Sequence, residues 1–182
     1  MEKICQTCMH HCRLKPGQWG ICRARKNEGG EIICKNYGRI SSLALDPIEK
    51  KPLRRFFPGS KMLSAGSFGC NLRCPFCQNY EISMIKPEIS ADSYLSPREL
   101  SDIAVKCREK GNIGVAFTYN EPLVGWEYVL DTARLVRKAG MKNVLVTNGT
   151  ASPEILGRLL PYIDAMNIDL KGFREEYYKK LG

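Results

Sequence analysis

The sequence lacks the long apolar stretches that membrane-spanning and exported proteins carry. No apolar run approaches the roughly 18 residues needed to cross a bilayer, and the first five residues, MEKIC, contain no signal-peptide core. Both absences argue against a membrane-spanning or secreted protein. We therefore expect a cytoplasmic location and no membrane partner.

Signatures of several common protein classes are also missing. The chain has no Ser/His/Asp set, no P-loop, no paired-carboxylate hydrolase pattern and no recognisable RNA-binding motif. Its net charge is nevertheless +9, and the excess gathers in residues 13–26 and 50–61. A solvated surface explains these basic stretches, as does binding to an acidic protein, an anionic cofactor or RNA. Without an RNA-binding motif, we do not expect a nucleic-acid partner.

Cysteine is abundant, and its spacing is informative. Cys70, Cys74 and Cys77 follow the pattern C-x3-C-x2-C, and thiolates in such runs hold iron–sulfur clusters. Three thiolates would leave one iron of a four-iron cluster open to a ligand from outside the protein, as catalytic metal sites do. The alternative is a structural metal site or a set of reduced core cysteines.

A second group of cysteines lies at the N-terminus, in a segment with few large apolar residues. Such a segment cannot close a core by itself and usually needs a metal or disulfides. We expect structural zinc there, although a second iron–sulfur cluster or an unmetallated segment is also consistent with the pattern. His10 and His11 are either substitute ligands or polar loop residues. The expected ligands, at spacing C-x2-C-x3-C-x9-C, are Cys5, Cys8, Cys12 and Cys22.

From Met62 onward, short apolar runs alternate with amphipathic ones. This alternation predicts an α/β fold with a parallel sheet and right-handed crossovers. Ser96 and Ser152 are expected to cap helices, and Cys107 should lie on a buried helix face. Expected strands cover 62–68, 113–118, 143–147 and 164–170, with helices after 96, 122, 152 and 174.

The chain should divide into three parts. Residues 1–30 form the cysteine-rich, zinc-knuckle-like segment, residues 31–61 form a linker with short strands, and residues 62–182 form the core. Proline and basic residues in 46–61 indicate a connection laid over the surface. The core offers about four βα units.

Polar residues follow each expected strand of the core. Ligands of parallel sheets bind beyond the carboxyl ends of the strands, so these residues are candidates for one site. They are the three cysteines after the first strand, Asn120 and Glu121 after the second, Thr147 and Asn148 after the third, and Asp169 and Lys171 near the end of the fourth.

The motif C-x3-C-x-Phe-C after an expected strand resembles the signature of the radical S-adenosylmethionine (SAM) superfamily. This resemblance implies a partial (βα) barrel, a [4Fe–4S] cluster held by the three cysteines, and SAM bound to the open iron. The family's barrel usually has six βα units. The chain would then be a fragment that lacks the later units, or a short variant.

Further motifs narrow the resemblance. The N-terminal pattern C-x2-C-x-His-His-C, the run DPIEKKPL at 46–53 and FPGS at 57–60 are together similar to AmmeMemoRadiSam-system radical SAM enzymes, relatives of the pyruvate formate-lyase-activating enzymes. The match suggests that Asp46, Pro47 and Lys51 help form the mouth of the site. It also implies an electron donor such as flavodoxin or ferredoxin, and a protein substrate as one option.

The resemblance also suggests roles for the polar residues. Glu121, supported by Asn120, would meet the SAM ammonium, Asp169 the ribose and Lys171 the carboxylate. Thr147 and Asn148 would reach the ribose or another polar edge, and Phe76 would pack near the adenine. The simpler alternatives are a helix cap for Glu121, a surface ion pair for Asp169 with Lys171, and a plain turn for Thr147 with Asn148.

Three functions follow from these patterns. The first is a radical SAM enzyme that makes a 5′-deoxyadenosyl radical and abstracts hydrogen from an unknown substrate. The second is an activating enzyme that acts on a backbone glycine of a glycyl-radical enzyme. The third, of another class, is a non-catalytic iron–sulfur or zinc module that binds RNA or an acidic protein.

Overall fold

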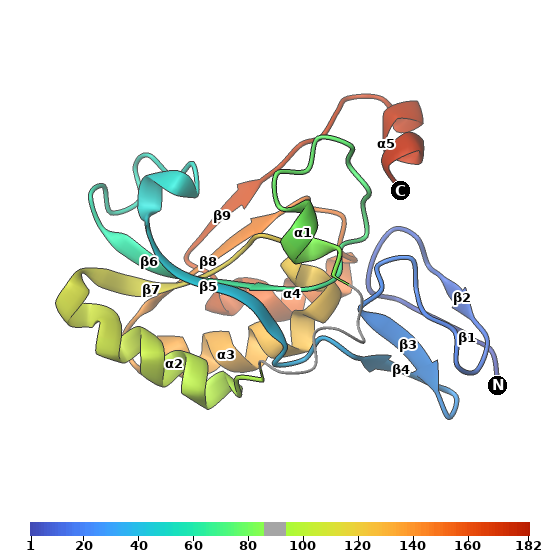
Figure 1. Ribbon diagram of the computed structural model, residues 1–182, viewed down its shortest axis with the longest axis horizontal. Helices are drawn as coiled ribbons and strands as arrows, with labels where there is room; N and C mark the ends of the chain where they lie inside the picture. Colours follow the sequence, from blue (N-terminus) through green and yellow to red (C-terminus); the bar gives the residue numbers. More distant parts are fainter. Residues whose placement is uncertain (86–93) are drawn as a thin grey trace.

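A computed structural model describes residues 1–85 and 94–182. Its centre is a five-stranded sheet in the order β5-β6-β7-β8-β9 (Figure 1). Strands β6 to β9 run parallel, and β5 pairs antiparallel with β6. The strands are β5 (Ile40–Pro47), β6 (Lys61–Ser67), β7 (Asn112–Phe117), β8 (Lys142–Thr147) and β9 (Ala165–Ile168). The predicted α/β class and the four parallel strands are thus confirmed.

Helices cover one face of this sheet and leave the other more open. The helices α2, α3 and α4 lie along one side, below the sheet in Figure 1, whereas α1 and the loops around it lie on the other side. The helices are α1 (Tyr80–Ser83), α2 (Pro97–Lys106), α3 (Trp126–Lys138), α4 (Pro153–Leu159) and α5 (Glu175–Leu181). Short 3₁₀ turns are η1 (Ile48–Lys50), η3 (Cys107–Lys110), η4 (Pro122–Gly125) and η5 (Leu160–Tyr162).

Alternation along the strands produces two apolar clusters. Val115 and Phe117 belong to the larger cluster, between the sheet and the helices. Ala116 lies between them in the sequence and belongs to the cluster on the opposite face of the sheet. There, Ile48 of η1 packs with Met62, Ala116 and Val144. The segment after β5 therefore fills one end of the sheet's second face.

Two helix starts differ from one another although their sequences look alike. Ser96 forms the predicted capping box with Glu99, and its side chain accepts from the Glu99 amide. Ser152 occupies the N-cap position of α4 without a side-chain capping bond. The predicted cap at Ser152 is therefore correct in position only.

Two other predictions need correction. Cys107 is half-exposed, because α2 ends at Lys106 and the chain tightens into η3, which turns Cys107 off the buried face. A short strand is present in the predicted linker as β5, but it belongs to the main sheet as its edge strand. That pairing joins a strand of the predicted linker to the first strand of the predicted core. The residues of β5 alone carry no local pattern that predicts it.

The cysteine-rich segment and the first residues of the predicted linker fold as two small hairpins beside the sheet, and the second hairpin crosses the predicted boundary at residue 30. The first pairs β1 (Lys3–Ile4) with β2 (Arg13–Leu14), and the second pairs β3 (Arg25–Glu28) with β4 (Glu31–Cys34). Figure 1 shows both on the same side of the molecule as α5. None of the helices within the described ranges combines the length and the apolar character of a membrane span.

Candidate functional site

The loop that follows β6 carries the three closely spaced cysteines. Gly69 adopts a left-handed φ of 93°, and a Cβ at this position would lie 2.6 Å from the Ala24 Cβ. Only glycine fits this close approach to the N-terminal segment. The chain then turns so that the Cys77 amide donates to the Cys74 carbonyl at 3.1 Å.

These cysteines and the predicted cofactor residues line one cavity. Its volume is about 340 Å³, and it opens on the side of the sheet where β6, β7, β8 and β9 end. Every predicted site residue of the core lies in its wall: Cys70, Cys74, Phe76, Cys77, Asn120, Glu121, Thr147, Asn148, Asp169 and Lys171. The expectation that four strand ends contribute to one site is met in geometry.

Glu121 joins the ends of two strands. Its carboxylate accepts hydrogen bonds from Thr147 Oγ1 at 2.7 Å, from the Asn148 amide at 2.7 Å and from the Leu123 amide at 3.1 Å. Burial raises the pKa of Glu121, while these three donors act in the opposite direction. Glu121 therefore caps η4 as well as lining the cavity.

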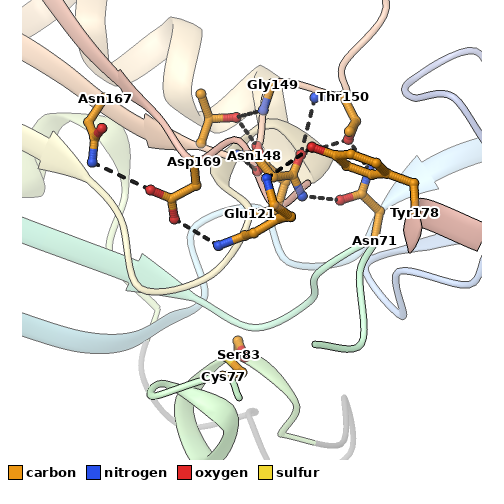
Figure 2. Close-up of polar contacts among 12 residues, drawn as sticks. Asn71, Cys77, Ser83, Glu121, Asn148, Gly149, Thr150, Asn167, Asp169 and Tyr178 are labelled. Carbon is orange, nitrogen blue, oxygen red and sulfur yellow. Dashed lines mark hydrogen bonds and ion pairs between the residues drawn. The ribbon is translucent and has the colours of Figure 1, made fainter. Parts of the chain in front are cut away.

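A chain of amide contacts extends from Glu121 to the cysteine loop. Asn148 Nδ2 donates to Asn71 Oδ1 at 2.9 Å, and Asn71 lies directly after Cys70. Figure 2 shows Glu121, Asn148 and Asn71 in this sequence, with Thr150 bonded to both asparagines. Sequence reasoning missed Asn71, because an asparagine between two loop residues carries no pattern of its own.

Asp169 and Lys171 form an ion pair at the edge of the cavity. Lys171 Nζ lies 2.9 Å from Asp169 Oδ2, and both side chains are partly exposed. Burial would lower the pKa of Lys171, but Asp169 raises it above the usual value. The ion pair that we gave as the alternative to cofactor binding is present, and both residues also line the cavity.

Burial disfavours the thiolate form of two of these cysteines. Burial raises the pKa of Cys70 to about 12 and also raises the pKa of Cys74, the latter against the nearby charge of Lys171. A bound metal reverses this preference, because the cation stabilises the thiolate. Binding of iron by these thiolates would therefore have to offset their burial.

A single metal ion is a poorer fit than a cluster. Within residues 1–85 and 94–182, no three Cys, His, Asp or Glu side chains come close enough to hold one ion. An iron–sulfur cluster differs, since each thiolate binds a separate iron of a larger body. Cys70, Cys74 and Cys77 all line one cavity, which is the placement that such a cluster needs.

The N-terminal cysteines lack ligand geometry for zinc. Cys5, Cys8 and Cys22 are buried and Cys12 is half-buried, yet they belong to no ion-binding group in the described part of the chain. Burial raises the pKa of Cys22 to about 11. Zinc in this segment therefore stays a prediction.

Backbone contacts attach this segment to the site. The Met9 amide donates to the Thr150 carbonyl at 3.1 Å, and the Ser152 amide donates to the Thr7 carbonyl at 3.0 Å. His10 Nε2 lies 2.7 Å from the Asn71 carbonyl oxygen. His10 thus meets the cysteine loop, whereas His11 Nδ1 lies 3.2 Å from Gln6 Oε1 within the N-terminal segment.

The predicted mouth of the site lies elsewhere. Asp46 and Lys51 are 6% and 3% exposed, and neither lines the cavity. Asp46 accepts a hydrogen bond from Tyr119, and Tyr119 does line the cavity. Charged residues in a proline-rich stretch indicated a surface, but here they pair with each other under the sheet's second face.

Comparison with known proteins agrees with this geometry. The sequence model of the Radical SAM superfamily matches residues 66–182, so the chain belongs to that superfamily. The match begins at the end of β6 and includes every cavity residue of the core that the sequence predicted.

Among the relatives, an uncharacterized protein of Methanocaldococcus jannaschii, MJ0808, is 41% identical over 177 residues, which are 97% of this chain and 51% of that protein. Pyruvate formate-lyase-activating enzymes of Listeria monocytogenes and Listeria innocua are each 29% identical over 122 residues, 62% of this chain and 48% of theirs. The chain thus spans about half the length of the curated relatives it matches.

Proposed function

We propose that the protein is an enzyme that reductively cleaves SAM at a [4Fe–4S] cluster held by Cys70, Cys74 and Cys77. One observation carries the proposal: three thiols and the polar groups of four strand ends line a single cavity. When bound, the reduced cluster and SAM supply a 5′-deoxyadenosyl radical that abstracts hydrogen from a substrate. The residues' own contribution is to bind, orient and shield these groups.

The cavity offers a group for each part of SAM. Lys171 is a cation for the carboxylate, and Asp169 beside it is an acceptor for the ribose hydroxyls. Glu121 already accepts three hydrogen bonds, which leaves about one of its roughly four lone-pair directions for the ammonium. Thr147 and Asn148 supply further polar edges, and the half-exposed ring of Phe76 supplies an apolar wall.

The direct test is anaerobic reconstitution with iron and sulfide, followed by reduction and addition of SAM. We expect 5′-deoxyadenosine from the native chain and none from Cys77→Ala. Cys107→Ala is the matched control, because Cys107 lies outside the cavity and should leave product formation unchanged. Absence of 5′-deoxyadenosine from native protein whose cluster is verified spectroscopically contradicts the proposal.

A narrower activity is hydrogen abstraction from a backbone glycine of a partner protein. Similarity to the pyruvate formate-lyase-activating enzymes favours it over other substrates. Such an enzyme would take its electron from a flavodoxin or ferredoxin, an acidic class of protein that suits the net charge of +9. Transfer of deuterium from a labelled partner glycine into 5′-deoxyadenosine would support it, and transfer only from small molecules would contradict it.

Membership of the AmmeMemoRadiSam system is a further proposal, supported by the N-terminal cysteine pattern together with the core motif. Metal analysis of a variant with Cys70, Cys74 and Cys77 changed to alanine tests the N-terminal ligands. Retained zinc supports the zinc knuckle, and retained iron with sulfide supports a second cluster. If the native protein binds metal but never cleaves SAM, the non-catalytic module becomes the better description.

A further inference from the structure

Tyr119 has an unusual backbone for an aromatic residue. Its φ is 74°, in the left-handed region that residues with bulky side chains seldom adopt. Such a conformation persists only where the surroundings hold it in place, and it concentrates at functional sites. The neighbouring contacts should therefore reveal what holds Tyr119.

The side chain of Tyr119 packs against Gly66 of β6. A Cβ added at Gly66 would approach Tyr119 Cδ2 to 2.8 Å, so only glycine allows this contact. From there the phenol reaches along the sheet, and its hydroxyl donates to Asp46 Oδ2 at 2.6 Å. Tyr119 thus runs from the cavity wall to a charged group behind it.

Asp46 is held in turn by two lysines at the end of η1, Lys50 and its C-cap residue Lys51. Lys51 Nζ lies 2.9 Å from Asp46 Oδ2 and 5.0 Å from the centre of the Tyr119 ring, and Lys50 Nζ lies 3.1 Å from Asp46 Oδ1. Asp46 and Lys51 are almost fully buried. The buried Asp46–Lys51 ion pair accepts the Tyr119 hydroxyl hydrogen bond. A charge-assisted bond of this kind holds Tyr119 more firmly than packing alone.

The next two residues carry this constraint into the site. Asn120 Nδ2 donates to the Gly69 carbonyl at 2.9 Å, and its Oδ1 accepts from the Ser67 amide at 3.1 Å, which holds the start of the cysteine loop. Glu121 holds Thr147 and Asn148. A shift of Tyr119 would therefore move the contacts of both strand ends.

We propose that Asp46, Lys51 and Tyr119 form a positioning network beneath the cavity that fixes residues 119–121 in the geometry that binds SAM. The inference rests on the proposed function for the identity of the cofactor. The three residues act through Asn120 and Glu121 and not by reaction with the substrate.

The test compares Tyr119→Phe and Asp46→Asn with Tyr37→Phe in the reconstituted full chain. Tyr37 is the matched control, because its hydroxyl donates to Asp131 Oδ2 at 2.7 Å, a similar bond outside the cavity wall. Equilibrium dialysis with labelled SAM should show about tenfold weaker binding for the two network variants. Iron content should stay unchanged in all of them, and Tyr37→Phe should bind like the native chain.

A second readout needs no cofactor. Hydrogen exchange of residues 118–123 in the unreconstituted protein should quicken in Tyr119→Phe and stay native in Tyr37→Phe. Equal exchange in both variants, or native SAM affinity in Tyr119→Phe, overturns the network. If the native chain itself binds no SAM, the proposed function fails. The exchange experiment still tests whether Tyr119 fixes residues 118–123, because it needs no cofactor.

Tyr119→Gly separates positioning from simple backbone tolerance. Glycine accepts the left-handed φ without strain but removes the ring and hydroxyl. We expect SAM binding at least as weak as in Tyr119→Phe. Native affinity in Tyr119→Gly would mean that this position needs only a left-handed residue, which contradicts the proposal.

Discussion

Asp46 is a buried residue whose carboxylate stays ionised, although burial disfavours charge. Burial alone would raise its pKa, but hydrogen bonds from Tyr119, Lys51 and Lys50 outweigh burial and hold the pKa well below the usual range. Tyr119 is affected in the opposite sense, because burial and the donated bond to Asp46 raise its pKa to about 12. The carboxylate therefore stays ionised and the phenol stays protonated at any ordinary pH.

This arrangement predicts a specific response to acid. A carboxylate with a depressed native pKa contributes stability that is complete above its unfolded pKa of about 4 and fades as the pH falls toward the native value. We expect the free energy of unfolding to drop below about pH 5 more steeply in the native chain than in Asp46→Asn. Urea unfolding of both proteins at a series of pH values measures the two slopes.

The control for this experiment is Glu99→Gln, which alters an exposed carboxylate whose pKa is also lowered, by Ser96. Its effect on the pH slope should be small, since solvent screens an exposed group. Equal slopes for the native chain and Asp46→Asn would show that Asp46 is not held as the structure indicates.

At the scale of elements, helix starts differ in what their caps contribute. Ser96→Ala removes a capping bond and should lower the free energy of unfolding by about 1 kcal/mol. Ser152→Ala should change the free energy of unfolding by no more than a few tenths of a kcal/mol in either direction, because Ser152 makes no capping bond and its buried Oγ has no partner to lose. Urea denaturation compares them, and equal losses would contradict the difference between the two caps.

The sequence predicts the core elements well because each carries a local signal. Ser96-Pro97 starts α2, and Gly111 ends the following turn with a φ of 84°. In α3 the inward residues Val129, Ala133 and Val136 are all buried. Such signals lie within a few residues of one another, so pattern reasoning finds them.

Other features depend on distant contacts, and sequence patterns do not reveal them. The hydrogen bond from Tyr119 to Asp46 joins residues 73 positions apart, and the left-handed φ of Tyr119 belongs to that contact. The burial of Asp46 with Lys51 and the pairing of β5 with β6 likewise depend on how the chain packs in three dimensions. The same holds for Glu121, whose type suggested a cofactor contact but whose three protein donors come from η4 and the end of β8. Residue type indicated the site, while the contacts within it came from the structure.

At the scale of the whole molecule, the N-terminal segment is joined to the core by a buried cation. Arg25 donates to the Val124 carbonyl at 2.9 Å and forms an ion pair with Glu127 at 2.5 Å, so that β3 is tied to η4 and α3. Burial would lower the pKa of Arg25, but Glu127 raises it. Arg25 therefore attaches the N-terminal segment to the core independently of the cysteines.

Breaking this link should destabilise the molecule. Arg25→Ala should lower the free energy of unfolding by roughly 2–4 kcal/mol, because it leaves the Val124 carbonyl and Glu127 without their partner. Lys179→Ala, in the exposed Lys179–Glu175 pair, should cost less than about 1 kcal/mol. Urea unfolding measures both, and similar losses would mean that the segment is held mainly by other contacts.

The arrangement of the whole site can be examined through the cluster itself. The most direct measurement is the electron paramagnetic resonance spectrum of the reduced, reconstituted protein before and after addition of SAM. We expect the signal of a [4Fe–4S] cluster that changes when SAM binds the iron that lacks a cysteine ligand, and no such signal from Cys70→Ala. A cluster signal that SAM leaves unchanged would contradict the central claim.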